Sequence, residues 1–176
     1  MIFEKRAAHI PQGGEVCLPG GMIEPEETSE QAALREWEEE TGISQDRLEL
    51  VGCFGTLVHA AARQIDVWLT ISPSFSALSP NLSDEVDTLF SVTLGQLMNA
   101  PWKSYLLDQT ITISPESPPV PFEKYQLKEY RRGSWSSRTF PVWFVEDLPE
   151  LLWGMTAIMV RAFLIELYGR EPGKVE

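Results

Sequence analysis

The stretch GGMIEPEETSEQAALREWEEETGI, residues 20–43, decides how this chain folds. Its second half predicts a helix over residues 28–41. Thr28 is a suitable N-cap, because Gln31 follows three residues later and completes a capping box. Gly42 stands where a residue in the left-handed conformation ends a helix. The stretch therefore predicts a loop that leads into a well-defined helix.

The predicted helix is rich in carboxylates. Eight of the 26 acidic residues of the chain lie between Glu24 and Glu40. On a helix, Glu36, Glu39 and Glu40 occupy positions i, i+3 and i+4 and share a fan about 100° wide. Like charges at this spacing destabilise a helix unless they are solvated or bind a cation. Two interpretations stay open at this point, a solvated acidic face and a site for a hard cation such as Mg²⁺.

The residues around these carboxylates follow a fixed spacing. A glycine is followed after five residues by a glutamate, and after seven more by an Arg-Glu pair. This pattern resembles the Nudix box at every fixed position, although Trp37 stands where an aliphatic residue is usual. The residues that carry the resemblance are Gly21, Glu27, Arg35, Glu36, Glu39, Glu40 and Gly42.

The resemblance implies a fold and a cofactor. The family folds as an α/β/α sandwich with a mixed sheet, in which the box forms a loop–helix–loop, and we expect residues 1–176 to form one such domain. It implies that Mg²⁺ or Mn²⁺ is held against a diphosphate. By position, the metal ligands would be the side chains of Glu36, Glu39 and Glu40, joined by the carbonyl of Gly20.

Two further roles follow from the same resemblance. Glu27 and Arg35 would form an ion pair that fixes the loop of the box against its helix. The alternative for this pair is an ordinary surface ion pair of little energetic value. One carboxylate of the box would accept a proton from the attacking water, and Glu39 and Glu36 are both candidates for this general base.

The segment before the box suggests a substrate. Residues 14–21, GEVCLPGG, follow Arg6 and are similar to the extended signature of coenzyme A diphosphatases. Leu18 replaces the usual phenylalanine, and the spacing between Arg6 and this segment departs from the family pattern. Stretches within residues 81–94 and 138–157 are similar to the same subfamily.

This resemblance implies hydrolysis of coenzyme A or acyl-CoA to 3′,5′-ADP and a phosphopantetheine. Substrate contacts would come from Arg6, Gly20, Gly21 and Arg138. A local basic cluster agrees with an anionic substrate, since it stands out from the net negative charge of the chain. Five of the 14 basic residues belong to it, namely Lys124, Lys128, Arg131, Arg132 and Arg138.

Other functions stay open. One is a Nudix diphosphatase that acts on another nucleoside diphosphate derivative, such as ADP-ribose or a dinucleotide. Another is a Nudix domain that binds a nucleotide without hydrolysing it. The retained carboxylates at 36, 39 and 40 argue against a binder without catalysis.

Composition restricts the class of protein. The chain has 176 residues, of which 43% are hydrophobic, enough for one domain with a real core. Its net charge of −12 argues against partners such as nucleic acid or an anionic membrane. The chain has only two cysteines, Cys17 and Cys53, so no disulfide framework is expected and the predicted location is cytoplasmic. Both cysteines are expected to be small buried side chains. Family resemblance further suggests a homodimer.

Outside the box, β-branched and aromatic runs predict strands, and a long apolar run that ends at Gly169 predicts a second helix. Strands that alternate with two substantial helices indicate the α/β class. The predicted strands are residues 2–3, 48–55, 64–71, 88–92 and 138–145, and the predicted second helix is 151–168.

Overall fold

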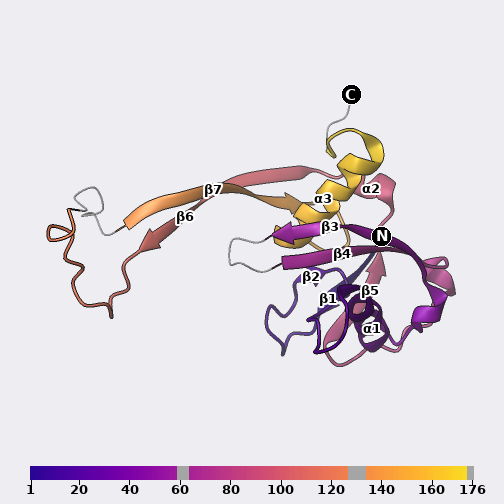
Figure 1. Cartoon of the computed structure of the whole chain (residues 1–176). Helices are drawn as coiled ribbons and strands as arrows, with labels where there is room; N and C mark the ends of the chain where they lie inside the picture. Colours follow the sequence, from indigo (N-terminus) through magenta and orange to yellow (C-terminus); the bar gives the residue numbers. More distant parts are fainter. Residues whose placement is uncertain (59–63, 127–133, 174–176) are drawn as a thin grey trace.

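The computed structural model describes residues 1–58, 64–126 and 134–173. Helix α1, Ser29–Thr41, is the helix predicted from the box (Figure 1). The side chain of Thr28 accepts a hydrogen bond from the backbone N–H of Gln31 at 3.2 Å, and the Gln31 side chain accepts one from the backbone N–H of Thr28 at 2.8 Å. Gly42 ends the helix with φ of 67°. Both predicted end signals are confirmed.

The strands form three small sheets, and every pair between described residues is antiparallel. Strands and helices together confirm the α/β class. The mixed sheet is not seen in the described part of the chain, because no parallel pair occurs there. The first sheet has the order β2-β1-β5, formed by Val16–Cys17, Ile2–Arg6 and Val86–Ser91; the second pairs β3 with β4, Glu49–Val58 and Gln64–Ile71; the third has the order β6-β7-β8, formed by Trp102–Thr112, Ser134–Val145 and Leu152–Trp153.

The C-terminal helix begins later than its sequence suggests. Helix α3 is Gly154–Tyr168, because Leu152 and Trp153 pair with Val145 and Phe144 as strand β8. A shorter helix, α2, is Leu94–Asn99. No helix in the described ranges is long and apolar enough to cross a bilayer.

Strand β6 was not predicted. It pairs with β7 along its whole length, and the hairpin extends away from the rest of the molecule (Figure 1). All residues of β6 after Trp102 are exposed. A strand exposed on both faces needs no alternation of polar and apolar residues, so its sequence carries no signal of period two.

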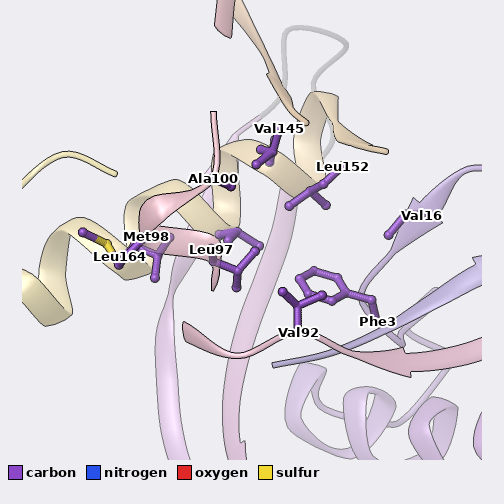
Figure 2. Close-up of a cluster of buried hydrophobic side chains, with 11 residues drawn as sticks. Phe3, Val16, Val92, Leu97, Met98, Ala100, Val145, Leu152 and Leu164 are labelled. Atoms are coloured by element: carbon purple, nitrogen blue, oxygen red, sulfur yellow. The ribbon is translucent and has the colours of Figure 1, made fainter. Parts of the chain in front are cut away.

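Two clusters of buried side chains position the box. The larger joins α2, α3 and the ends of β1 and β7, and Figure 2 shows Phe3 of β1 directed towards it together with Leu97 and Leu164. The smaller surrounds Trp37 of α1, and Ile2 packs against it. Successive side chains of a strand point to opposite faces, so β1 lies between the two clusters and holds α1 beside the larger core.

Candidate active site

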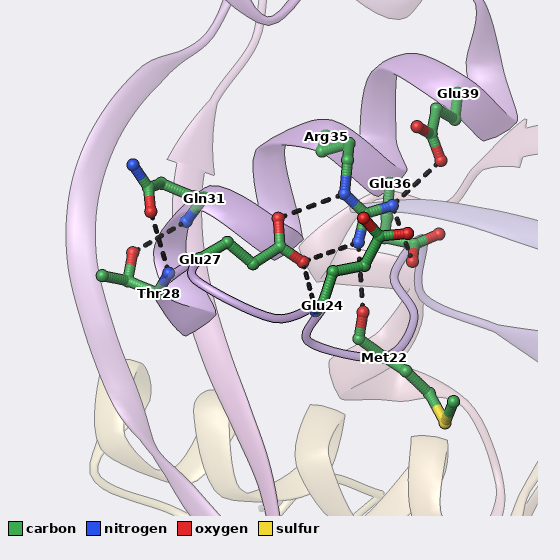
Figure 3. A network of polar contacts seen from close by, with 8 residues as sticks. All are labelled: Met22, Glu24, Glu27, Thr28, Gln31, Arg35, Glu36 and Glu39. Atoms are coloured by element: carbon green, nitrogen blue, oxygen red, sulfur yellow. Dashed lines mark hydrogen bonds and ion pairs between the residues drawn. The ribbon is translucent and has the colours of Figure 1, made fainter.

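One guanidinium group joins the loop of the box to its helix (Figure 3). Arg35 donates from Nε to Glu27 Oε2 at 3.2 Å and from Nη2 to Glu27 Oε1 at 2.8 Å. Nη2 also donates to the carbonyl oxygen of Met22 at 3.1 Å, while Glu27 Oε1 accepts from the backbone N–H of Glu24 at 2.6 Å. Hydrogen bonds from Arg35 hold the pKa of Glu27 below its usual range. The expected ion pair is present, and it is bidentate, which makes it directional.

The same guanidinium contacts two of the three carboxylates expected to bind metal. Arg35 Nη1 lies 3.1 Å from Glu36 Oε1 and 3.0 Å from Glu39 Oε2. The side chain of Glu36 is 17% exposed and that of Glu39 is 60% exposed. Glu39 is therefore the member of the trio most open to solvent, and Glu36 is enclosed between the helix and the loop.

The two glycines before the box contact its carboxylates. A Cβ added to Gly21 would lie 2.2 Å from Glu36 Oε1, so only glycine lets this carboxylate approach the loop. Gly20 has a φ of 148°, a backbone conformation that glycine adopts readily and other residues rarely do. Its backbone N–H donates to Glu40 Oε2 at 2.8 Å. These glycines were expected to contact substrate, and in the structure they also place Glu36 and Glu40.

Glu40 is the buried member of the trio, only 6% exposed. Burial raises its pKa to about 8, and the nearby charge of Glu4 adds to the shift. Glu4, on β1, is 1% exposed. Burial raises the pKa of Glu4 as well, against the hydrogen bond that it accepts from Cys17 Sγ at 3.0 Å. The two carboxyl groups therefore share a poorly solvated space between β1 and α1.

Glu4 was not among the site residues predicted from the sequence. One signal was available, because in the strand IFEKR a charged residue occupies the position that alternates with Ile2. Ile2 faces the cluster around Trp37, so the next side chain on that face, Glu4, also turns towards α1. Spacing along the chain could not show that it would meet Glu40, because the two residues come from different elements.

The trio does not form a ready-made metal cage. Within the described ranges, no group of three or more His, Cys, Asp or Glu side chains is arranged to hold a metal ion. The donor chemistry nevertheless suits Mg²⁺ or Mn²⁺, since Glu36 and Glu40 offer carboxylate oxygens at one end of α1 and Gly21 leaves room beside Glu36. Arg35 contacts Glu36 Oε1 and Glu39 Oε2, so binding by all three would use the other oxygen of each carboxylate or a turn of the side chains away from Arg35. The predicted ligand set stays a prediction.

The expected substrate residues are not brought together. Arg6 lies on β1, close to the box, and donates from Nε to the carbonyl oxygen of Pro11 at 3.1 Å. Arg138 is exposed on β7 opposite Gln109, in the hairpin that leaves the main body (Figure 1). Lys124 lies with its Nζ 5.5 Å from the ring centroid of Tyr125. The remaining members of the basic cluster lie outside the described residues, namely Lys128, Arg131 and Arg132.

The two cysteines differ from the expectation of buried side chains. Cys53 is exposed on β3, because the strand presents that position to solvent. Cys17 is half-buried and has a polar partner, the carboxylate of Glu4. Both thiols are free.

Comparisons with known proteins agree with the box. The model of the NUDIX domain matches residues 3–110. Nudix hydrolase 3 of Caenorhabditis elegans is 34% identical over 107 residues, which are 56% of this chain and 42% of that protein. The Nudix hydrolase NudL of Escherichia coli O7:K1, itself described as uncharacterised, is 26% identical over 169 residues, 95% of this chain and 74% of that protein.

A solved structure shows a partial likeness. The C. elegans Ap4A hydrolase in a binary complex is 26% identical and covers 53% of this chain and 68% of its own, with a TM-score of 0.46. The chain thus spans less than half of the length of Nudix hydrolase 3 and about three quarters of the length of NudL.

Proposed function

This chain belongs to the Nudix hydrolase family, and from that premise we propose that it hydrolyses the diphosphate of coenzyme A or of an acyl-CoA. The products would be 3′,5′-ADP and phosphopantetheine or its acyl derivative. Family membership alone supports the coarser activity, hydrolysis of a nucleoside diphosphate derivative. The finer proposal needs support from residues outside the box.

One observation carries the substrate proposal. Residues 14–21, similar to the signature of coenzyme A diphosphatases, run directly into the box. In the fold, Val16 and Cys17 of this segment pair with β1, which carries Arg6. The segment ends at Gly20, whose backbone N–H contacts Glu40. The segment with the substrate signature thus lies beside the carboxylate helix, and Arg6 of the neighbouring strand would supply a cation for a substrate phosphate.

The chemistry assigned to this surface is an attack of water on phosphorus. A bound Mg²⁺ or Mn²⁺ would neutralise the non-bridging oxygens of the diphosphate and make a water easier to deprotonate. Glu36, Glu39 and Glu40 would hold the cation, and Glu39 or Glu36 would take the proton of the attacking water. The water oxygen forms a bond to phosphorus, the bridging P–O bond breaks, and the electron pair of that bond remains on the departing phosphate.

Arg35 and Glu27 would act through position. Their bidentate pair holds Met22 and the rest of the loop at a fixed distance from α1. A carboxylate displaced by about 1 Å from its reacting partner can lower a rate by about 100-fold. The ion pair therefore matters for the rate even though neither residue needs to touch the substrate.

A panel of substrates tests the proposal. The full chain is incubated with coenzyme A, acetyl-CoA, ADP-ribose and a diadenosine polyphosphate, each with Mg²⁺ and with Mn²⁺, and the products are identified by mass. The proposal expects 3′,5′-ADP from coenzyme A at the highest kcat/KM. A higher kcat/KM for release of AMP from ADP-ribose or from the dinucleotide would overturn the substrate class. Binding of all compounds without any product would overturn the hydrolase itself.

A further inference from the structure

Glu4 has a buried carboxylate, and its two oxygens differ in their hydrogen-bond partners. Its side chain is 1% exposed, and Oε1 accepts the hydrogen bond from Cys17 Sγ at 3.0 Å. Apart from the carboxyl group of Glu40, Oε2 has no hydrogen-bond partner in the described part of the chain. Buried carboxylate oxygens are nearly always paired, because burial removes the water that would solvate them. A buried oxygen that meets only another acidic group points to a cation that can bind between the two and replace the shared proton.

The side chain that Glu4 faces is also acidic. Glu40 is 6% exposed, a side-chain hydrogen bond joins the two carboxyl groups, and the charge of Glu4 acts on Glu40. One oxygen of Glu40 is occupied by the backbone N–H of Gly20. Two carboxylates that share so dry a space repel each other unless a cation or a proton lies between them.

Among the described residues, the cationic side chain of Arg6 comes close to this space without forming an ion pair with either carboxylate. Its charge favours ionisation of Glu4 and it contacts the Cys17 thiol, while its Nε donates to the carbonyl of Pro11. Lys5, the neighbour on β1, points to the other face and pairs with Glu150 at 2.9 Å. Among the described residues, neither Glu4 nor Glu40 has an ion pair within 4.0 Å. Glu85 adds a further negative charge nearby.

We propose that Glu4 is an additional carboxylate ligand of the divalent-cation site, which binds the ion through its Oε2 together with Glu40. The site would then be built from β1 and α1 jointly, rather than from the helix of the box alone. The inference rests on the proposed function, because it assumes that the box binds a divalent cation. It names a residue outside the box and outside the set expected from the sequence.

The donor atoms select the kind of cation. Glu4 and Glu40 offer oxygens, which suit hard ions such as Mg²⁺ and Mn²⁺. The adjacent Cys17 could in principle attract a thiophilic metal such as Zn²⁺. Burial and the charge of Glu4 raise the pKa of the Cys17 thiol, so it remains protonated and acts as a hydrogen-bond donor to Glu4. Its role is to orient the carboxylate.

Calorimetric titration with MnCl₂, in the absence of substrate, tests the role of Glu4. Glu4→Gln keeps the shape of the side chain and removes the charge. We expect its Mn²⁺ Kd to rise at least about tenfold over the unchanged chain, in the range seen when groups around a metal site are lost. Glu38→Gln is the matched control, because it removes one charge from an exposed position of α1. An equal Kd for the Glu4 variant and the unchanged chain would overturn the proposal.

Thermal unfolding supplies a readout that a purely structural role would not move. A metal bound by the folded state raises Tm, and the increase grows with the logarithm of its affinity. With EDTA, Glu4→Gln should unfold at a temperature at least as high as the unchanged chain, since it removes a buried charge. With Mn²⁺, its gain in Tm should be smaller. A full Mn²⁺-induced gain in Glu4→Gln would contradict the proposal.

A measurement on the unchanged chain covers the case in which Glu4→Gln does not fold. A crystal soaked in MnCl₂ should give an anomalous peak within bonding distance of Glu4 Oε2, about 2.2 Å. A peak at Glu36 and Glu40 with Glu4 out of reach would overturn the role of Glu4 and leave the proposed function intact. Absence of Mn²⁺ binding to the unchanged chain, by calorimetry and in the crystal, would instead overturn the metal-dependent function.

Discussion

Arg35 contacts three carboxylates and one carbonyl oxygen with a single guanidinium group. An arginine suits this position because its planar fork matches a carboxylate in two parallel hydrogen bonds, which a lysine cannot do. The spacing of Glu27 and Arg35 in the sequence predicted their pairing. It did not predict that Glu36 and Glu39 would turn to the same group, because side-chain directions depend on the loop that folds over the helix.

Gly21→Ala tests how closely the loop approaches the helix. The added methyl group would meet the end of a flexible side chain, Glu36, so we expect stability to change little. The carboxylate would have to move, and we expect hydrolysis to slow by about 100-fold. Gly55→Ala is the control, because a Cβ there meets nothing within 4 Å. Unchanged kcat in Gly21→Ala would show that the position of Glu36 is not critical.

The ion pair of Glu27 and Arg35 should make the stability of the folded chain depend on pH. The folded-state pKa of Glu27 lies below its usual value of 4.5, so its contribution to stability is present above that pH. It is lost as the pH falls through the lowered pKa. We expect Glu27→Gln to unfold at lower urea concentration than the unchanged chain at pH 7, and the difference to be smaller at an acidic pH at which Glu27 becomes protonated. A difference of equal size at both pH values would rule out the charge of Glu27 as its source.

At the scale of elements, α1 was predictable because its signals are local. The capping box of Thr28 and Gln31 and the stop at Gly42 each depend on residues within one or two turns. Strand β6 was not predictable, because it pairs with β7 while remaining exposed and so has no apolar face to reveal it. Glu4 was missed for a related reason, since its meeting with Glu40 depends on how β1 packs against α1.

Two glycines that end helices offer a matched comparison. Gly42 and Gly169 have nearly the same φ, 67° and 65°. A Cβ at Gly169 would meet nothing within 4 Å, whereas one at Gly42 would lie 2.4 Å from the carbonyl oxygen of Asn81. The backbone N–H of Asn81 donates to the carbonyl oxygen of Thr41, which holds Asn81 in place. We expect Gly169→Ala to lower the free energy of unfolding by about 1 kcal/mol, and Gly42→Ala to lower it by clearly more. Equal losses in urea unfolding would contradict the contact with Asn81.

The whole molecule divides into a packed body and an extended hairpin (Figure 1). The body contains both clusters of buried side chains, and β1 joins them. The hairpin carries exposed apolar side chains such as Leu106, which is 73% exposed. Most helices and strands of the body were predicted from the sequence. Arg138 was expected to contact the substrate, whereas the fold places this residue on the hairpin.

Two leucine substitutions compare the body with the hairpin. Leu97 is fully buried among α2 and α3, so Leu97→Ala should lower the free energy of unfolding by about 2–5 kcal/mol. Leu106→Ala should change it by no more than about 0.5 kcal/mol. Urea unfolding measures both. A large loss for Leu106→Ala at high protein concentration, absent on dilution, would show that a second copy covers the hairpin, as the expected homodimer would allow.

The central claim is that the carboxylates of α1 bind a divalent cation for hydrolysis of a diphosphate. The most direct measurement is a titration of Mn²⁺ followed by the electron paramagnetic resonance signal of the free ion, with the unchanged chain and with Glu36→Gln. We predict that the unchanged chain removes the free signal and turns over substrate, and that the variant binds Mn²⁺ at least about tenfold more weakly and loses nearly all turnover. Equal binding and equal turnover in the two proteins would contradict the claim.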